Sequence, residues 1–331
     1  MEEQVLKTIN KYNLIKSGDK IVLAVSGGPD SIFMLDILNK IRQNPKNNLS
    51  FNIIVCHVNH MIRKEAEEDE TYVINFCKKN NIEYYIKRID VQKYANNKKV
   101  GTEEAGRIVR YEFFDEIMQK TKANKIAIAH NKNDKVETII MNLLRGSGSL
   151  GIKGIEPKRD EKYIRPIIEI ERADIEKYCN QNKLEPRIDK TNFENTYTRN
   201  KIRNIVIPYI QKEFNPNIVN TITRLSEIIT EEQQYLSKIT KNEYQNLLIE
   251  EKENTIILDL KKFNILDNVI KKKLVLYTIT KLKGSSKGIE KIHIDDIIKL
   301  CKNNIGNKYL TPNKNIKILV KKGKIFFYSI T

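Results

Sequence analysis

Four short apolar segments alternate with helix-like segments over the first 150 residues. The apolar segments are 21–25, 52–58, 83–90 and 125–130, and most of them are rich in Ile and Val. The segments between and after them carry apolar residues at a three- to four-residue spacing, which is typical of helices. A chain that alternates in this way folds into a parallel sheet covered by helices. We therefore expect an α/β domain with a doubly wound, Rossmann-like parallel sheet.

The pattern changes in the second half of the chain. With 331 residues the chain is longer than one typical domain. A long helix is expected from about Ile218, and the tail alternates strand-like and helix-like segments. We expect three parts: the α/β domain over 1–213, a helical linker over 214–245, and a small basic α+β domain over 246–331.

The charge of the chain is strongly positive. It carries 59 Lys and Arg against 42 Asp and Glu, a formal net charge of +17, and residues 201–331 hold 24 of the basic and 13 of the acidic residues. Such an excess suits a polyanionic partner, although a Lys-rich composition with solvated faces accounts for it equally well. Twelve of the 13 arginines lie at or before Arg203. Because Arg suits bidentate phosphate contacts, we expect phosphate chemistry in the first 200 residues.

Other features narrow the class of protein. No apolar run approaches the roughly 20 residues that a membrane helix needs, and the N-terminus does not read as a signal peptide. The four cysteines lie far apart and form no CxxC pair, which argues against a zinc ribbon or a paired-thiol redox site. We expect a cytoplasmic protein that has no membrane partner and whose cysteines are reduced.

Polar residues follow three of the expected strands. The strand ends read Ser-Gly-Gly at 26–28, His-Val-Asn-His at 57–60 and Ala-His-Asn at 129–131. Ligands of open α/β sheets bind beyond the carboxyl ends of the strands. The sequence therefore predicts a binding site at this edge of the sheet.

The segment Ser26-Gly27-Gly28-Pro29-Asp30-Ser31 follows a strand and opens a helix. Its glycines let backbone N–H groups converge, proline suits a first helical turn, and the helix start attracts an anion. A Walker A loop would place a Lys where Asp30 stands. This carboxylate suits Mg²⁺ that accompanies a phosphate. We prefer an anion loop to an ordinary strand–helix connection.

This hexapeptide resembles the PP-loop of N-type ATP pyrophosphatases, which cleave ATP between the α and β phosphates and adenylate a substrate. Four further segments resemble the bacterial tRNA(Ile)-lysidine synthetase family. They are His57–Arg63, Thr102–Tyr111, Ala129–Thr138 and Asp189–Arg203, and they follow the loop in family order. The resemblance covers about residues 20–210.

The resemblance implies a reaction and its partners. Members adenylate C2 of cytidine 34 in a tRNA(Ile) with a CAU anticodon, and the amine of L-lysine then displaces AMP. The cofactors would be ATP and Mg²⁺, and a homodimer is possible. Residues 1–213 would be the catalytic domain and 246–331 the tRNA-binding domain. The chain resembles the short form of the family.

The resemblance also assigns residues. The ATP-binding set would be Ser26, Gly27, Gly28, Pro29, Asp30, Ser31, His57 and Arg110, with Asp30 also reaching Mg²⁺. The lysine-binding and catalytic set would be Asp134, Glu137, His130 and Asn131. Contacts to phosphate or tRNA would come from Arg63, Arg107, Arg199 and Arg203.

The chemistry of several of these residues points the same way. Asp134 and Glu137 are three residues apart, so both carboxylates share one helix face and suit an ammonium ligand; the alternative is an acidic first turn favoured by the helix dipole. Arg107 and Arg110 also share a face and suit an α-phosphate or a base, unless they are merely solvated. Arg199 and Arg203 are four residues apart and suit the tRNA backbone, the lysine carboxylate or the leaving group; a surface stripe of a helix is equally open.

The basic tail suggests how the tRNA is held. We expect the Lys-rich 261–331 region and the helical linker to attract it electrostatically, with Lys271, Lys272 and Lys273 as representatives. Two rival functions remain. One is another PP-loop tRNA enzyme, a thiolase, which the missing CxxC disfavours. The other is a noncatalytic, nucleotide-gated tRNA-binding protein, which the retained carboxylates disfavour.

Overall fold

The computed structural model describes residues 1–61, 66–187, 197–303 and 308–330. Two compact units are present, Met1–Glu227 and Ile228–Thr331. The long helix α11, Ile218–Leu247, runs across this division. None of the described helices is both long enough and apolar enough to cross a membrane.

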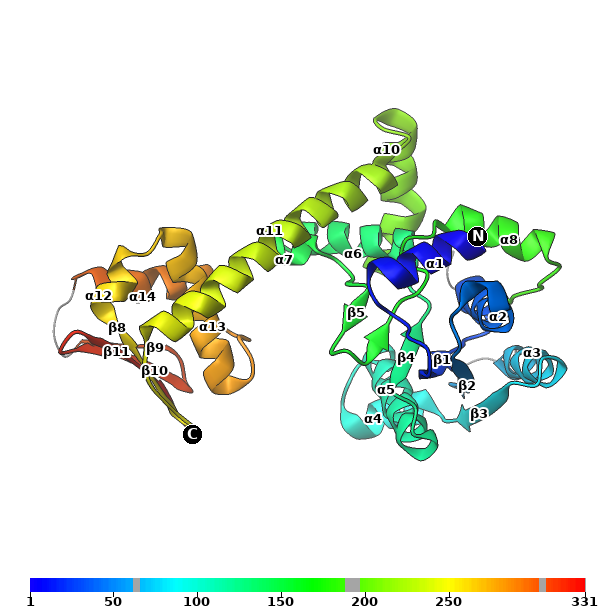
Figure 1. The fold of residues 1–331 in the computed structure, drawn as a ribbon, viewed down its shortest axis with the longest axis horizontal. Helices are drawn as coiled ribbons and strands as arrows, with labels where there is room; N and C mark the ends of the chain where they lie inside the picture. The colour runs from blue at the N-terminus through cyan, green and yellow to red at the C-terminus, as the bar shows by residue number, and fades with distance from the viewer. Residues whose placement is uncertain (62–65, 188–196, 304–307, 331) are drawn as a thin grey trace. The chain divides into compact units, whose positions relative to one another are not determined.

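The N-terminal unit is built on a six-stranded sheet in the order β3-β2-β1-β4-β6-β5. All neighbours pair in parallel except β5 and β6. The sheet confirms the predicted doubly wound α/β fold, with β1 at its centre (Figure 1). Its strands are β1 Lys20–Ala24, β2 Asn52–Asn59, β3 Glu83–Arg88, β4 Lys125–Ile128, β5 Lys158–Arg159 and β6 Tyr163–Ile164.

Helices cover both faces of this sheet, because successive strand residues point to opposite sides. Leu23 packs with α1, α2, α3 and α8, whereas Val22 packs with α5. The helices of the unit are α1 Glu2–Lys11, α2 Pro29–Gln43, α3 Ala66–Lys79, α4 Val91–Lys98, α5 Thr102–Thr121, α6 Lys132–Leu144, α7 Ser149–Ile152, α8 Arg172–Gln181, α9 Thr198–Lys201 and α10 Ile207–Glu213.

A single π-helical segment, Ile202–Val206, joins α9 to α10. Pro208 follows it and has no N–H to donate to the carbonyl four residues before it. Irregular turns of this kind occur where such a ladder bond is missing, and they are common at functional sites. The sequence reading did not predict this helical run.

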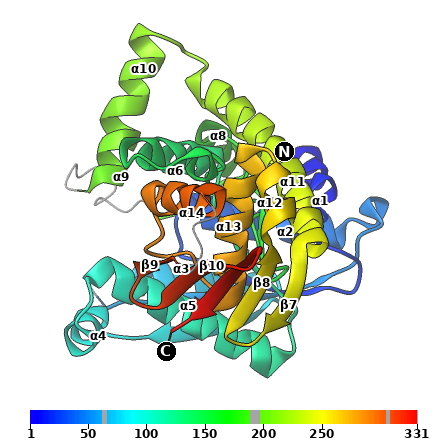
Figure 2. The same ribbon diagram turned by 90° about the vertical axis from the view of Figure 1, so that its left-hand side faces the viewer.

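The C-terminal unit contains a five-stranded antiparallel sheet in the order β7-β8-β11-β10-β9. Its core side packs against α12, α13 and α14, as Figure 2 shows. The sequence analysis predicted an alternation of strand-like and helix-like segments here, and the structure has both in this unit. The elements are β7 Leu248–Lys252, β8 Thr255–Asp259, α12 Leu260–Ile265, α13 Asn268–Lys283, α14 Lys291–Asn303, β9 Tyr309–Asn313, β10 Ile316–Lys321 and β11 Lys324–Ser329.

Candidate active site

The loop after β1 is held open by its own hydrogen bonds. Gly27 adopts φ +94°, a left-handed conformation that favours glycine. Gly28 is the N-cap of α2 and Pro29 occupies its first turn. The Ser31 hydroxyl donates to the Gly28 carbonyl at 2.9 Å and accepts from the Ser26 backbone N–H at 3.1 Å. The turn thus presents a helix N-terminus and two hydroxyls at the end of the central strand, as an anion site requires.

Two residues that the sequence reading missed fix this loop from outside. The Arg187 N–H donates to the Gly27 carbonyl at 3.0 Å. A Cβ on Gly27 would meet Cβ of Asp69, a buried residue of α3, at 3.3 Å. Both partners are distant in sequence from the loop, so no local motif could reveal them.

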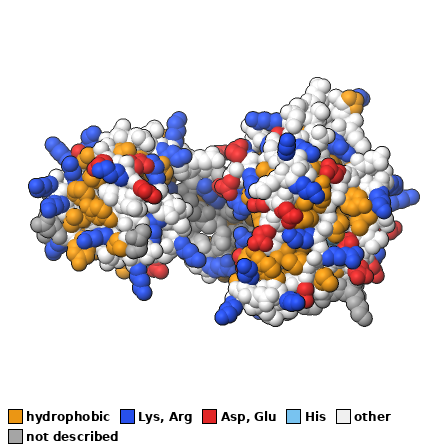
Figure 3. All heavy atoms as spheres, turned by 90° about the horizontal axis from the view of Figure 1, so that it is seen from below, with side chains coloured by type: hydrophobic (Ala, Val, Ile, Leu, Met, Phe, Trp, Pro, Cys, Tyr) orange, Lys and Arg blue, Asp and Glu red, His pale blue; other side chains and the backbone are white. Residues whose placement is uncertain are grey.

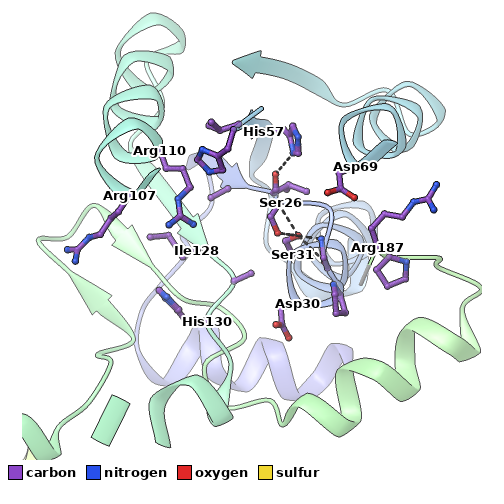
Figure 4. Close-up of a pocket in the computed structure, with 18 of the residues that line it drawn as sticks. Ser26, Asp30, Ser31, His57, Asp69, Arg107, Arg110, Ile128, His130 and Arg187 are labelled. Carbon is purple, nitrogen blue, oxygen red and sulfur yellow. Dashed lines mark hydrogen bonds between the residues drawn. The ribbon is translucent and has the colours of Figure 1, made fainter. Parts of the chain in front are cut away.

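The loop opens into a cleft of about 1910 Å³ within the N-terminal unit. Its walls come from the ends of β1, β2 and β4, from α5 and from α8. In Figure 4, Arg107, Arg110 and His130 lie on one side of the loop, and Asp69 and Arg187 lie on the other. The polar strand ends therefore meet in one cavity, as predicted for a parallel sheet.

Three histidines line the cleft in different ways. His57 is buried, and its Nδ1 bonds the Val25 carbonyl at 2.9 Å, so it braces the end of β1. The Nδ1 atom of His60 is buried with no partner among the described residues. His130 accepts at Nδ1 a hydrogen bond of 3.1 Å from Nε of Arg165. Because Arg can only donate, this bond places the His130 proton on Nε2.

Burial lowers the pKa of His130 to about 4. Replacing Arg165 with methionine removes both the donor to Nδ1 and a neighbouring positive charge. We expect the pKa of His130 to rise toward the ordinary value near 6.5 and the proton to be shared between both ring nitrogens. Histidine ¹⁵N NMR over a pH series measures both changes, with His293 of the C-terminal unit as an internal control. An unchanged tautomer in the variant would show that Arg165 does not orient the ring.

Arginines form the wall opposite the loop. Arg110 donates from Nε to the Gly106 carbonyl at 3.2 Å, and burial lowers its pKa. Arg107 and Arg159 lie over the Tyr111 ring, with 5.8 and 5.5 Å between the guanidinium carbon and the ring centroid. These cations line the cleft, where a polyanionic ligand would meet them.

A chain of hydrogen bonds connects the loop to α6. Asn131 is fully buried and donates from Nδ2 to Asp30 Oδ1 at 2.8 Å. Its own oxygen accepts from the Asp134 N–H at 2.9 Å, and Asp134 Oδ2 accepts from the Asn131 N–H at 3.0 Å. This reciprocal pair is a capping box that starts α6. The anion loop and the carboxylate helix are therefore one connected unit.

Asp134 and Glu137 share one helix face, and three arginines surround them. Arg199 donates to Glu137 Oε2 at 2.9 Å and to Asp134 Oδ1 at 3.1 Å. Arg203 donates to Glu137 Oε1 at 2.6 Å and to Asp134 Oδ1 at 3.2 Å. Arg172 lies 3.5 and 3.6 Å from the same two carboxylates. Arg199 and Arg203 are therefore counterions of the acidic pair, with side chains 37% and 21% exposed, and do not form the solvated surface stripe that the sequence left open.

The sequence analysis did not predict Arg172 as a site residue, because it lies at the start of a different helix, α8, which has an ordinary amphipathic sequence. Arg63, also expected to contact phosphate or tRNA, lies outside the described residues. Among the described residues, no group of three or more His, Cys, Asp or Glu side chains is arranged to hold a metal ion. Asp30 at the start of α2 and Asp69 of α3 are carboxylates that lie beside the loop and line the cleft.

The three lysines expected to attract a polyanion lie on α13 and have partners within their own unit. Lys271 donates to the Asn264 carbonyl at 2.8 Å. Lys272 pairs with Asp295 at 2.9 Å. Lys273 donates to the side chain of a glutamine on α11 at 2.5 Å. The charge of Lys272 is thus partly offset, and all three ammonium groups have a hydrogen-bond or ion-pair partner within the C-terminal unit.

A glycine turn between a central parallel strand and a helix, opening onto a cationic cleft, is the arrangement of a phosphate-binding α/β protein. Residues 1–210 match the PP-loop domain family. The tRNA(Ile)-lysidine synthase of Clostridium acetobutylicum is 49% identical over 316 residues, which cover 95% of this chain and 67% of the relative. The corresponding proteins of Clostridioides difficile and Clostridium tetani are 42% and 43% identical and cover 98% and 99% of this chain. The chain belongs to the tRNA(Ile)-lysidine synthase family, a family of ATP-using ligases.

The chain spans about two thirds of the length of these relatives, since 67 to 69% of each is matched. A solved structure, the U34-tRNA thiolase NcsA from Methanococcus maripaludis, superposes with a TM-score of 0.56 at 20% identity. The match covers 69% of this chain and 78% of that one, and it shows a shared fold alone. The expected family and fold class are thereby confirmed.

Proposed function

We propose that this chain forms lysidine at cytidine 34 of a CAU-anticodon tRNA(Ile), using ATP and L-lysine. The observation that carries the proposal is the hydrogen-bonded connection from Asp30 through Asn131 to Asp134. It joins the loop to a buried carboxylate pair whose arginine partners line the same cleft as the loop. A nucleotide at the loop and an amine at the carboxylates would then be held next to each other. Family membership supports the use of ATP.

The first proposed step is adenylation. The C2 oxygen of the cytosine attacks the α-phosphorus of ATP, and pyrophosphate leaves. Ser26, Ser31 and the N-terminus of α2 hold the terminal phosphates, while Arg110 neutralises charge at the α-phosphate. Neutral His130 donates from Nε2 to an oxygen of the cytosine or the α-phosphate. His57 supports the loop from behind through its bond to the end of β1.

The second step joins lysine to the base. The ε-amine attacks C2, AMP leaves with the former C2 oxygen, and the amine loses a proton. A free lysine amine has a pKa near 10.4, so it must be deprotonated before it attacks. We propose that Asp134 and Glu137 bind this ammonium group. The amine then replaces a guanidinium of Arg199 or Arg203 at the carboxylates, and the released guanidinium turns to phosphate.

Mg²⁺ fits the residues around the loop. This ion is commonly held by one or two carboxylates together with substrate phosphates. Asp30 supplies one carboxylate there, and burial together with the neighbouring Asp134 raises its pKa to about 6. A cation would offset both effects. We propose that Asp30 holds Mg²⁺ beside the ATP phosphates, where the ion would neutralise their charge.

This arrangement predicts a pH dependence. Because the pKa of Asp30 is raised to about 6, its side chain is mostly neutral below about pH 6 in the folded protein. The positive charges of Arg172 and Arg203 lower this pKa and so limit the rise. We expect Mg²⁺-dependent ATP affinity to be constant above pH 7 and to fall up to about tenfold per pH unit below 6. Calorimetric titration with and without Mg²⁺ measures it. Asp30→Asn should remove both the Mg²⁺ dependence and the pH dependence; a variant that keeps the wild-type profile would exclude Asp30 as the titrating group.

The tRNA is proposed to be held by charge outside the cleft as well as within it. Arg107 at the cleft wall and, beyond the described residues, Arg63 are assigned to phosphate contacts. Lys271, Lys272 and Lys273 add long-range attraction. Because these lysines have internal partners, neutralising all three to glutamine should weaken tRNA binding only a few-fold. The salt slope of log Kd should become shallower; an unchanged slope would refute their role.

The function is tested by radiolabelled lysine transfer. The purified chain is incubated with ATP, labelled lysine and a CAU-anticodon tRNA(Ile) transcript, with an elongator methionine tRNA as the control. We expect label in the isoleucine transcript alone, with one AMP and one pyrophosphate released per lysine. A noncatalytic tRNA-binding protein would release no AMP in response to lysine. A thiolase would leave lysine untransferred and would need a sulfur donor.

A further inference from the structure

The sheet of the C-terminal unit has two chemically different faces. Along β10 and β11 every second residue is fully buried in the core with α12, α13 and α14, among them Ile318 and Phe327. The residues between them are partly or fully exposed and belong to no described core cluster. Figure 3, which views the molecule from below, shows hydrophobic side chains on this unit with Lys and Arg side chains around them.

Aromatic rings occupy the middle of this open face. Phe326 and Tyr328 lie two residues apart on β11, the central strand, and their rings are stacked with centroids 6.0 Å apart and an interplanar angle of 10°. A third ring, Tyr309, is 58% exposed on the edge strand β9. Its ring lies 4.4 Å from the ammonium of Lys317, which pairs across the strands with Tyr328.

Lysines flank these rings without being neutralised. Lys317, Lys321 and Lys324 make no ion pair with any described residue, unlike Lys252 at the far edge, which pairs with Glu250. The acidic residue nearest in register is Asp259, opposite Lys324, and its carboxylate caps the first turn of α12. The open face therefore combines stacked rings with unpaired cations.

This combination fits one kind of ligand better than others. A protein partner that covered the rings would strip water from three unpaired ammonium groups, which is costly. Duplex RNA would satisfy the lysines, but its bases are not available to the rings. Unpaired RNA offers both phosphates for the lysines and base faces for the rings, and each base stacked on an aromatic residue contributes about 1–3 kcal/mol.

We propose that the open face of this sheet, defined by Tyr309, Lys317, Lys321, Lys324, Phe326 and Tyr328, binds unpaired nucleotides of RNA. The choice of RNA rests on the proposed tRNA substrate, which has unpaired bases in its loops and at its 3′ end. The surface is independent of the lysine-transfer cleft, since all of its residues belong to the C-terminal unit.

The test uses the full chain and a six-nucleotide RNA with 2-aminopurine at its centre. Stacking on a ring quenches this fluorophore, so quenching and affinity are read together. We expect Phe326→Leu with Tyr328→Leu to weaken binding at least about tenfold and to abolish quenching. Tyr235→Leu, which removes a 66% exposed ring from α11 of the same unit, should change neither. Leucine is chosen because it preserves apolar area over β8. Thermal unfolding of each variant verifies that the sheet is intact.

A charge-matched pair of variants separates local contact from diffuse attraction. Lys317, Lys321 and Lys324 are changed to glutamine in one protein, and Lys291, Lys299 and Lys302 of α14 in the other. We expect the first triple variant to bind the six-mer at least fivefold more weakly than the second at 150 mM salt. Equal losses in both would overturn the proposal in favour of diffuse attraction. Equal affinity for a duplex of the same length would also overturn it.

Two further outcomes are diagnostic. If the leucine pair changes sedimentation of the free protein but not RNA affinity, the face joins two copies of the chain, and the RNA proposal is wrong. Lysine transfer is measured separately. If the wild-type chain quenches the six-mer but does not transfer lysine, the proposed function is wrong and the RNA-binding role of the sheet surface stands. If it transfers lysine normally but does not quench the six-mer, only the RNA-binding role of the sheet surface is wrong.

Discussion

Replacing Asp134 with asparagine is expected to lower lysine transfer by about two to three orders of magnitude, while ATP affinity changes less than about threefold. Asparagine preserves a side-chain oxygen for the cap of α6, so the helix start is kept. The charge that Arg172, Arg199 and Arg203 share is lost, and with it the attraction for an incoming ammonium group. Alanine in place of asparagine would in addition remove the cap.

Single-turnover assays locate the defect. Pyrophosphate release in the presence of tRNA reports adenylation, and labelled lysine in the RNA reports the second step. We expect the variant to retain adenylation and lose transfer. Asp36→Asn is the matched control: it changes another buried carboxylate, which pairs with Lys40 on α2 and not with the arginines of the cleft. An equal loss of ATP binding in the Asp134 variant would show that this carboxylate serves the nucleotide.

Gly27→Ala is expected to lower ATP affinity by about a hundredfold. The φ of +94° is unfavourable for alanine, and the new Cβ would press on Asp69 at 3.3 Å. The strain, about 1–2 kcal/mol, is relieved by moving the turn out of its left-handed conformation. That movement turns the amides and hydroxyls of the loop away from a common point. Affinity for ATP is measured by calorimetry, and stability by thermal unfolding.

Gly18→Ala provides the control for backbone strain. Gly18 has a similar φ of +89°, but nothing lies within 4 Å of its Cβ position, and it precedes β1 and so lies outside the loop of residues 26–31. Both variants should lose comparable stability, whereas only the Gly27 variant should lose nucleotide affinity. If ATP binds both equally well, the loop does not hold the phosphates.

The sheet and the anion loop were predictable because their signals are local. Strands β1, β2 and β4 are mostly apolar runs, with Ile or Val in each, and their residues are buried on both faces of the sheet. Residues Ser26–Ser31 contain the turn, the cap and the first helical residues in consecutive positions. The short strands β5 and β6 have two residues each, too few for any periodicity. Strand β4 ends at Ile128, where the backbone N–H of His130 donates a hydrogen bond to the Ile128 carbonyl.

The arrangement of charges in the cleft was not predictable from spacing. Arg203 and Glu137 are 66 residues apart, and Arg165 and His130 are 35 apart. A motif shows which residue types are present, but it does not show which cation will sit against which carboxylate. Asp134 and Glu137 were recognised as a pair from their helical spacing. Their enclosure by three guanidinium groups depends on how α8, α9 and the π-helical segment pack against α6.

That enclosure has a thermodynamic consequence. Two carboxylates and three guanidinium groups leave an excess of one positive charge when the pocket is empty. An ammonium ligand increases this excess of positive charge. Its affinity is therefore higher when an anion is already bound beside the displaced arginine. By reciprocity the amino acid must then tighten the hold on that anion by the same factor. Substrates that arrive in either order should therefore reinforce one another, with their cooperativity weakening as salt is added.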